Sequence, residues 1–181
     1  MYQNMGCGIK EVSKKMALRK IVEQGEECLT KVCRPVEAFN RRLHDLLDDM
    51  AETLQNANGA GLAAPQVGVL RRLVVIDMGE LSGGVLKLVN PKIIHKQGRQ
   101  VCDEGCLSFP DQWAQTVRPY QVTVQALDEN GQEIQLTGEG ELAQCFCHEL
   151  DHLDGIVFLQ RAIKTSPAAP SKGRRRQNRK A

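Results

Sequence analysis

The segment that most constrains this chain is the pentapeptide His148-Glu149-Leu150-Asp151-His152. Two histidines four residues apart lie on one face of an α-helix, so both imidazoles can reach a single metal ion. The glutamate between them lies one step around the helix, where it can address a water molecule on that metal. Chance matches to so short a motif are common. A helix with two hydrogen-bonded histidines and no metal is therefore the alternative interpretation.

The residues around the motif have the pattern of an amphipathic helix, which is the element that the motif requires. Apolar residues recur at helical spacing between positions 140 and 154, namely Leu142, Cys145, Phe146, Leu150 and Leu153. Gly155 follows, and glycine commonly ends a helix. We therefore expect one helix over residues 140–154 that carries both histidines.

A catalytic site of this type takes three protein ligands and leaves one position for water. No His, Cys or Glu follows His152, and Asp154 is badly placed to meet the same ion. Upstream, the chain offers His44, His95 and seven cysteines. Cys145 precedes the second histidine by about 10 Å of helix axis, which one ion cannot comfortably span.

Two upstream segments can approach such a helix closely. Glu104-Gly105-Cys106-Leu107-Ser108 places a cysteine on a separate segment, beside a glycine that permits close backbone approach to a ligand. Gly59-Ala60-Gly61-Leu62-Ala63-Ala64-Pro65-Gln66 has little side-chain bulk. This second segment is either a tight connection on the core or the rim of an active site. Gln66 adds an amide N–H that could donate to a developing oxyanion.

Together, these three segments resemble the three motifs of the peptide deformylases in order and in spacing. The resemblance extends from about Ala17 to Leu159. Three motifs together are far more specific than any one of them. The resemblance implies a metal-dependent hydrolase that removes the formyl group from the N-terminal formyl-methionine of newly made polypeptides and releases formate.

The resemblance also implies how the catalytic residues divide the chemistry. One divalent metal would be held by Cys106, His148 and His152. Fe²⁺ is implied as the native ion, with Zn²⁺, Ni²⁺ or Co²⁺ as possible substitutes, and mixed nitrogen and sulfur ligation suits all four. Glu149 would take a proton from the attacking water and deliver it to the leaving amine. The Gln66 side chain and the Leu107 backbone N–H would donate to the oxyanion.

Substrate contacts follow from the same resemblance. The residues expected to align the peptide backbone are Ala60, Gly61 and Gly105. Cys145, together with the first metal histidine, would border the pocket for the methionine side chain. A formyl carbon carries only hydrogen, so a crowded site accepts it and rejects acetyl.

Four features depart from the usual family pattern and leave the side-chain preference of the pocket open. Cys147 stands where many relatives have Gln, and Ala60 is smaller than the usual Val or Ile. Phe109 to Gln115, which includes Trp113, is an unusual segment after the cysteine motif. Gln144 is polar near a position that is commonly apolar.

The rest of the pattern predicts an α+β fold. A helix is expected over residues 38–57. Separately, Glu104 and Arg118 are expected to form an ion pair that supports the cysteine segment. Strands are expected over residues 73–76, 85–89, 93–101, 120–126, 134–137 and 156–159. We therefore expect mostly antiparallel strands packed around a central C-terminal helix that carries the histidines, with one N-terminal helix.

Composition changes near both ends of the chain. Residues 1–15 are polar and are expected to form a flexible extension, with a single catalytic domain over 16–163. Residues 164–181 are expected to form a basic disordered tail, because six of the last ten are Lys or Arg. This tail is either simply solvated or makes a sequence-independent contact with ribosomal RNA phosphates.

Seven cysteines without a disulfide pattern indicate free thiols in a reducing compartment. No stretch reaches membrane-spanning length, so a cytoplasmic monomer is expected. Two other functions stay open. An endopeptidase with the same histidine motif usually draws its third ligand from downstream, which this chain lacks. A catalytically silent metal-binding or ribosome-binding protein would not need Glu149 and Gln66.

Overall fold

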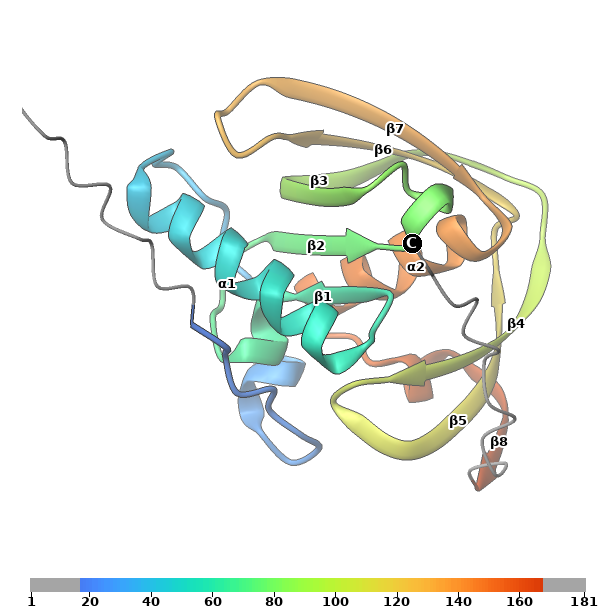
Figure 1. Cartoon of the computed structure of the whole chain (residues 1–181). Helices are drawn as coiled ribbons and strands as arrows, with labels where there is room; N and C mark the ends of the chain where they lie inside the picture. The colour runs from blue at the N-terminus through green and yellow to red at the C-terminus, as the bar shows by residue number, and fades with distance from the viewer. Residues whose placement is uncertain (1–16, 168–181) are drawn as a thin grey trace, which may run out of the picture.

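The computed structural model describes residues 17–167, which form two antiparallel sheets and two α-helices (Figure 1). In chain order the elements are η1 (Glu27–Thr30), α1 (Arg41–Ala57), β1 (Gly61–Ala63), η2 (Ala64–Val67), β2 (Leu73–Asp77), η3 (Gly79–Leu81), β3 (Val85–Gln97), β4 (Gln100–Cys106), β5 (Phe109–Arg118), β6 (Gln121–Leu127), β7 (Glu133–Glu139), α2 (Gly140–Leu153), η4 (Phe158–Arg161) and β8 (Ala162–Pro167), where η marks a 3-10 helix. The α+β class is confirmed.

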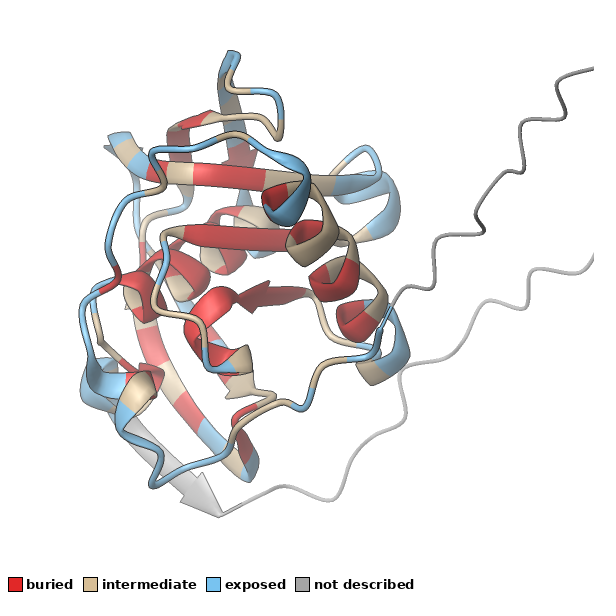
Figure 2. Cartoon of the chain, turned by 90° about the vertical axis from the view of Figure 1, so that its left-hand side faces the viewer, coloured by how far each residue is buried: buried red, intermediate tan, exposed pale blue. Residues whose placement is uncertain are grey.

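The larger sheet has the strand order β1-β2-β3-β6-β7, and α1 and α2 pack against its opposite faces. Strand β2 shows how the sequence achieves this. Val74 and Ile76 join the core under α2, whereas Leu73 and Val75 join the core under α1. Successive side chains of a strand alternate between faces, so a strand covered on both sides is a continuous apolar run. Figure 2 shows the buried residues concentrated in these central strands and helices.

The smaller sheet has the order β4-β5-β8. The β4–β5 hairpin pairs Gly105 with Trp113 and turns tightly, with Cys106 opposite Phe109. Helix α2 contacts β1, β2, β6 and β7 of the larger sheet and β5 of the smaller one. The helix therefore connects the two sheets, and β1 and β4 are the end strands that each sheet presents beside it.

The expected division of β3 at Asn90-Pro91 is wrong, because the strand continues through it. Asn90 takes a left-handed conformation (φ 51°) at an irregularity in the pairing with β6. Its side-chain amide accepts a hydrogen bond from the Val36 N–H and donates one to the Val36 carbonyl. That distant partner stabilises a backbone that looks like a break in the sequence. The turn lies instead at Gly98 (φ 69°), so the expected strand over 93–101 is wrong as well.

The C-terminal region differs from expectation in two places. The expected strand over 156–159 is wrong, because residues Phe158–Arg161 form a 3-10 helix. Strand β8 continues to Pro167, past the expected start of the tail at 164, because β5 supplies its backbone with hydrogen-bond partners. Residues 168–181 and the expected N-terminal extension lie outside the described residues. Within the described part, neither helix is long and apolar enough to span a membrane.

Candidate active site

Helix α2 presents the two histidines as the sequence predicts. It runs Gly140–Leu153 and buries the side of the helix that carries Phe146, Leu150 and Leu153 against the larger sheet. Its close approach to β7 depends on Gly138, since a Cβ there would lie 2.7 Å from Leu142 Cγ and 2.8 Å from Phe146 Cε2. A side chain at this point would overlap these two apolar side chains of the helix.

Cys106, His148 and His152 converge although the cysteine is more than forty residues from either histidine. One ligand atom of each lies within 4.8 Å of the others. The Cys106 Sγ is 3.3 Å from the His152 Nε2. A sulfur and a nitrogen bound to one tetrahedral zinc-sized ion are about 3.5 Å apart. Cysteine sulfur and histidine nitrogen are both common zinc ligands, and three protein ligands leave a fourth position open. The three residues therefore fit a divalent metal in both chemistry and spacing.

Glu104 fixes the orientation of His148. Its Oε2 lies 2.9 Å from the Nδ1 of that histidine, which leaves the Nε2 free to face a metal. The carboxylate is almost fully buried and also accepts hydrogen bonds from Arg118 at 2.6 and 3.0 Å and from the Thr116 hydroxyl at 2.6 Å. Burial raises the pKa of Glu104, but these hydrogen bonds lower it to about 2. The expected Glu104–Arg118 pair is confirmed.

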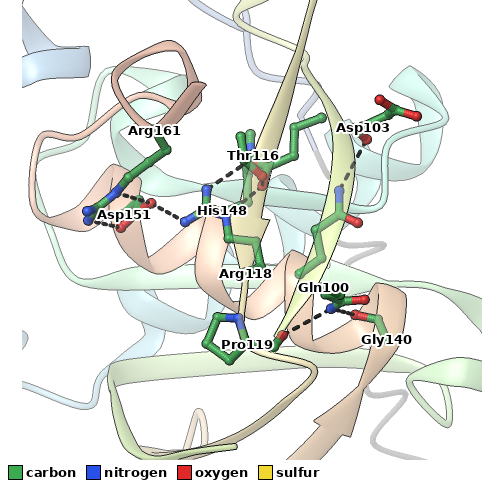
Figure 3. A network of polar contacts seen from close by, with 11 residues as sticks. Gln100, Asp103, Thr116, Arg118, Pro119, Gly140, His148, Asp151 and Arg161 are labelled. Carbon is green, nitrogen blue, oxygen red and sulfur yellow. Dashed lines mark hydrogen bonds and ion pairs between the residues drawn. The ribbon is translucent and has the colours of Figure 1, made fainter. Parts of the chain in front are cut away.

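Arg118 also connects this network to helix α2 (Figure 3). Its Nη1 donates to the Asp151 Oδ2 at 2.7 Å, and Arg161 donates to the same carboxylate from η4. The sequence analysis did not single out Thr116 or Asp151. Their positions in the sequence could have indicated them. Thr116 lies two residues before Arg118 on one face of β5, and Asp151 lies one helical turn after His148. The buried ion network ties the small sheet to α2 beside His148 and His152.

The two histidines have opposite protonation tendencies in the metal-free protein. Burial lowers the pKa of His152 to about 3. Burial also lowers the pKa of His148, but its hydrogen bonds with Cys106 and Glu104 outweigh burial and raise that pKa to about 10. A metal that binds His148 must therefore displace a proton.

Glu149 is buried beside β1 and is held at short range. A Cβ on Gly61 would lie 2.5 Å from the Glu149 Oε1, so only glycine leaves room for the carboxylate. The other oxygen, Oε2, has no hydrogen-bond partner among the described residues. Burial raises the pKa of Glu149 to about 7. A carboxylate with this pKa and an unsatisfied oxygen is suited to accept and return a proton near neutral pH.

Gln66 lies on η2 with its amide held in one orientation. Its Oε1 accepts the Ala63 N–H at 2.8 Å, so the Nε2 points the other way. That nitrogen lies 3.4 Å from the Cys106 Sγ and 3.3 Å from the Ser108 Oγ. Leu107 follows the cysteine, and its side chain packs at the Cα of Gly59. The structure therefore brings Gln66 to Cys106 and sets Leu107 against the Gly59 segment.

Backbone groups on the two end strands face outward at Gly61 and at Gly105. Ala60 O accepts the Asp77 N–H, which turns the Ala60 carbonyl toward β2 and the Gly61 groups to the free side. On β4, Gln144 donates to the Asp103 carbonyl, so positions 103 and 105 face the side away from β5. Within residues 17–167, Gly61 and Gly105 thus offer backbone groups without a strand partner, whereas the Ala60 carbonyl is already engaged.

Two further features complete the surroundings of the site. Cys145 is buried on α2, one turn before the first histidine, and burial raises the pKa of its thiol. A hollow of about 360 Å³ borders the β1 end strand and is lined by Gly59, Ala60, Asp77, Met78, Leu81 and Glu141. A larger hollow of about 470 Å³ lies at the start of α1, away from the chemistry.

Comparison with known proteins agrees with this geometry. A family model described as polypeptide deformylase matches residues 18–168. Peptide deformylase 2 of Clostridium acetobutylicum is 57% identical over 144 residues, which cover 79% of this chain and 94% of that protein. A crystal structure of a peptide deformylase from Legionella pneumophila matches with a TM-score of 0.77 at 44% identity, over 80% of this chain and 86% of the other. A Met-Ala-Ser-bound crystal structure of class I type b peptide deformylase from Acinetobacter baumannii gives a TM-score of 0.74 at 30% identity, over 81% and 99%. This chain therefore belongs to the polypeptide deformylases, metal-dependent hydrolases that remove the N-terminal formyl group of newly made peptides.

Proposed function

We propose that Cys106, His148 and His152 hold one divalent metal, with Fe²⁺ as the native ion and Zn²⁺, Ni²⁺ or Co²⁺ as substitutes. The observation that carries this proposal is the convergence of the three ligand atoms within 4.8 Å. When bound, the metal supplies Lewis-acid chemistry that polarises the formyl carbonyl and lowers the pKa of water. One thiolate among the ligands adds negative charge and makes the site sensitive to oxygen when iron is bound.

Glu149 acts as the general base and then as the general acid. It takes a proton from the attacking water and returns it to the nitrogen of the leaving amine, because an amine anion is a very poor leaving group. Its burial and its pKa of about 7 support both directions of transfer at neutral pH. Proton transfer of this kind typically contributes about 10²–10⁴ in rate.

The oxyanion of the tetrahedral intermediate is stabilised by the Gln66 side chain and the Leu107 backbone N–H. Support for Gln66 comes from its fixed orientation, because the hydrogen bond from the Ala63 N–H holds the Nε2 toward the Cys106 side of the site. Donors that are already oriented need no reorganisation during the reaction. The loss of one typically costs about 10²–10³ in rate.

The substrate is a peptide that begins with formyl-methionine and lies extended between β1 and β4. The outward backbone groups of Gly61 and Gly105 align it by strand addition. Ala60 contributes its small side chain to the bordering hollow, and Cys145 borders the methionine pocket. The Acinetobacter relative was solved with Met-Ala-Ser bound, which supports a methionine-first peptide as the ligand.

Formate release from a formyl-Met-Ala-Ser peptide tests this assignment, with protein purified without oxygen and analysed for metal. We expect release of formate and no cleavage of a blocked peptide at internal bonds. Glu149→Gln should retain the metal and lose about 10²–10⁴ in kcat. Full activity in that variant, or internal cleavage by the wild type, would refute the roles assigned here.

We further propose that the enzyme works as a monomer in the cytoplasm. The six cysteines among the described residues are all unpaired, which supports a reducing compartment. Light scattering would check the oligomeric state. For residues 164–181 we propose a sequence-independent contact with ribosomal RNA, on the basis of their positive charge. Removing the part beyond β8 should weaken ribosome binding and flatten its salt dependence, and an unchanged affinity would exclude that contact.

A further inference from the structure

Trp113 lies one strand away from the ligand cysteine and stays half exposed. Its residue is 46% exposed, although its strand neighbours Ala114 and Thr116 are buried. It is the single tryptophan of the sequence. A lone exposed aromatic residue is ordinary, so its exposure alone carries no meaning. Its position relative to β4 is what matters.

The indole of Trp113 lies against the place where a side chain at position 105 would stand. Trp113 pairs directly with Gly105 across the hairpin. Three atoms of its ring, Cε2, Cη2 and Cζ2, lie 3.3 Å from the position of a Cβ on Gly105. The ring therefore covers the backbone of β4 next to Cys106. Because position 105 has no side chain, no side chain of that residue stands between the indole and the free edge of β4.

The two faces of the hairpin are chemically distinct at this point. Cys102 and Glu104 point to the buried face of β4, toward α2, whereas Val101 and Asp103 point outward. Trp113 belongs to the outward face. The indole and the metal ligands are thus on opposite faces of one hairpin, joined at Gly105.

A peptide aligned along the Gly105 edge alternates its side chains between these same two faces. Its methionine side chain points inward, toward Cys145, so the side chain of the second residue points outward beside the indole. We propose that Trp113 is a specificity-determining residue that receives the second side chain of the formyl peptide and favours a bulky apolar one. The proposal rests on the substrate orientation given under the proposed function. Asp103, exposed on the same face, opposes an acidic second residue.

The test compares metal-loaded wild type, Trp113→Ala and Trp113→Phe on formyl-Met-Leu-Ser, formyl-Met-Phe-Ser and formyl-Met-Ser-Ser. Tyr120→Ala is the matched control. Tyr120 is 50% exposed and also packs against a turn glycine, Gly98. Trp113→Ala should lower kcat/KM for the Leu and Phe peptides by roughly two- to fivefold, the size of a cross-strand side-chain pair. The change should lie in KM, with the Ser peptide unaffected, and Trp113→Phe should restore part of it.

Intrinsic fluorescence gives a readout that does not depend on turnover. Because Trp113 is the sole tryptophan, titration of the wild type with the product Met-Phe-Ser should change its emission more than titration with Met-Ser-Ser. Equal losses for all three peptides, no loss in Trp113→Ala, or an emission that does not respond would overturn the inference. A wild type that releases no formate would overturn the proposed function instead, and the titration would still decide the role of Trp113.

Discussion

Gly61→Ala is the sharpest test of the proposed catalytic arrangement, because it adds one carbon between β1 and the Glu149 carboxylate. An ordinary van der Waals contact starts at 3.4 Å, whereas the Glu149 Oε1 would stand 2.5 Å from the new Cβ. The carboxylate must therefore move away by roughly 1 Å. A misplacement of about 1 Å can cost about 10²-fold in rate. Neither partner yields easily, since β1 is held in the sheet by β2 and the carboxylate is buried.

The same overlap should lower stability, by about 1–3 kcal/mol, the usual cost of an extra methyl group in a packed interior. Gly138→Ala provides the control. Its Cβ would meet Leu142 and Phe146 at 2.7 and 2.8 Å, a similar overlap that touches no proposed catalytic residue. Domains are commonly stable by 5–15 kcal/mol, so we expect both variants to stay folded.

The assay combines kcat from formate release with the free energy of unfolding from urea titration. Both variants should show the stability loss, but only Gly61→Ala should lose about 10²-fold in kcat while it keeps its metal. A Gly61→Ala enzyme within threefold of wild type would contradict the reasoning. So would an equal loss of kcat in Gly138→Ala, since the effect would then come from general loosening.

Three other perturbations address the metal and its support. Cys106→Ser should lose activity and weaken metal binding, because a hydroxyl is a far poorer ligand than a thiolate; unchanged metal content at equilibrium would contradict this. Apparent metal affinity should rise with pH between 6.5 and 8.5, by about tenfold per pH unit, because the metal displaces a proton from His148, whose pKa is raised to about 10 in the metal-free state. Calorimetry at several pH values would measure this rise, and an affinity that does not change with pH would exclude His148 as a protonated ligand. Arg118→Ala should destabilise the fold by about 3–5 kcal/mol, because it leaves Glu104 buried without its main counter-charge, and urea unfolding would detect the loss.

The sequence predicted those parts of the site that depend on local periodicity. The helix with His148 and His152 follows from apolar spacing and a glycine stop. The position of Cys106 rested on the family resemblance, because spacing alone does not place the β4 segment beside α2. Glu104 and Arg118 were expected to pair as a support for the cysteine segment, whereas Thr116 and Asp151 were not singled out. Their roles arise only when β5 and α2 meet.

The errors in the fold also come from long-range partners. Asn90-Pro91 looked like a strand break, but the hydrogen bonds with Val36, which is 54 positions away, hold the strand through it. The last four residues of β8, 164–167, were assigned to a tail because of their composition, and only pairing with β5 gives them an ordered backbone. In both places tertiary contacts override a local preference, which a reading of short windows cannot detect.

The placement of the three proposed metal ligands has a consequence for how the holoenzyme ages. One comes from the hairpin of the smaller sheet and two come from the helix packed on the larger one. A metal ion bound there would link the β4–β5 hairpin to helix α2, and its binding free energy would add to the stability of the fold. Oxidation of Cys106 should therefore weaken the attachment of the hairpin to the helix and also inactivate the enzyme. Molecules that have lost their metal should therefore melt at a lower temperature than those that retain it.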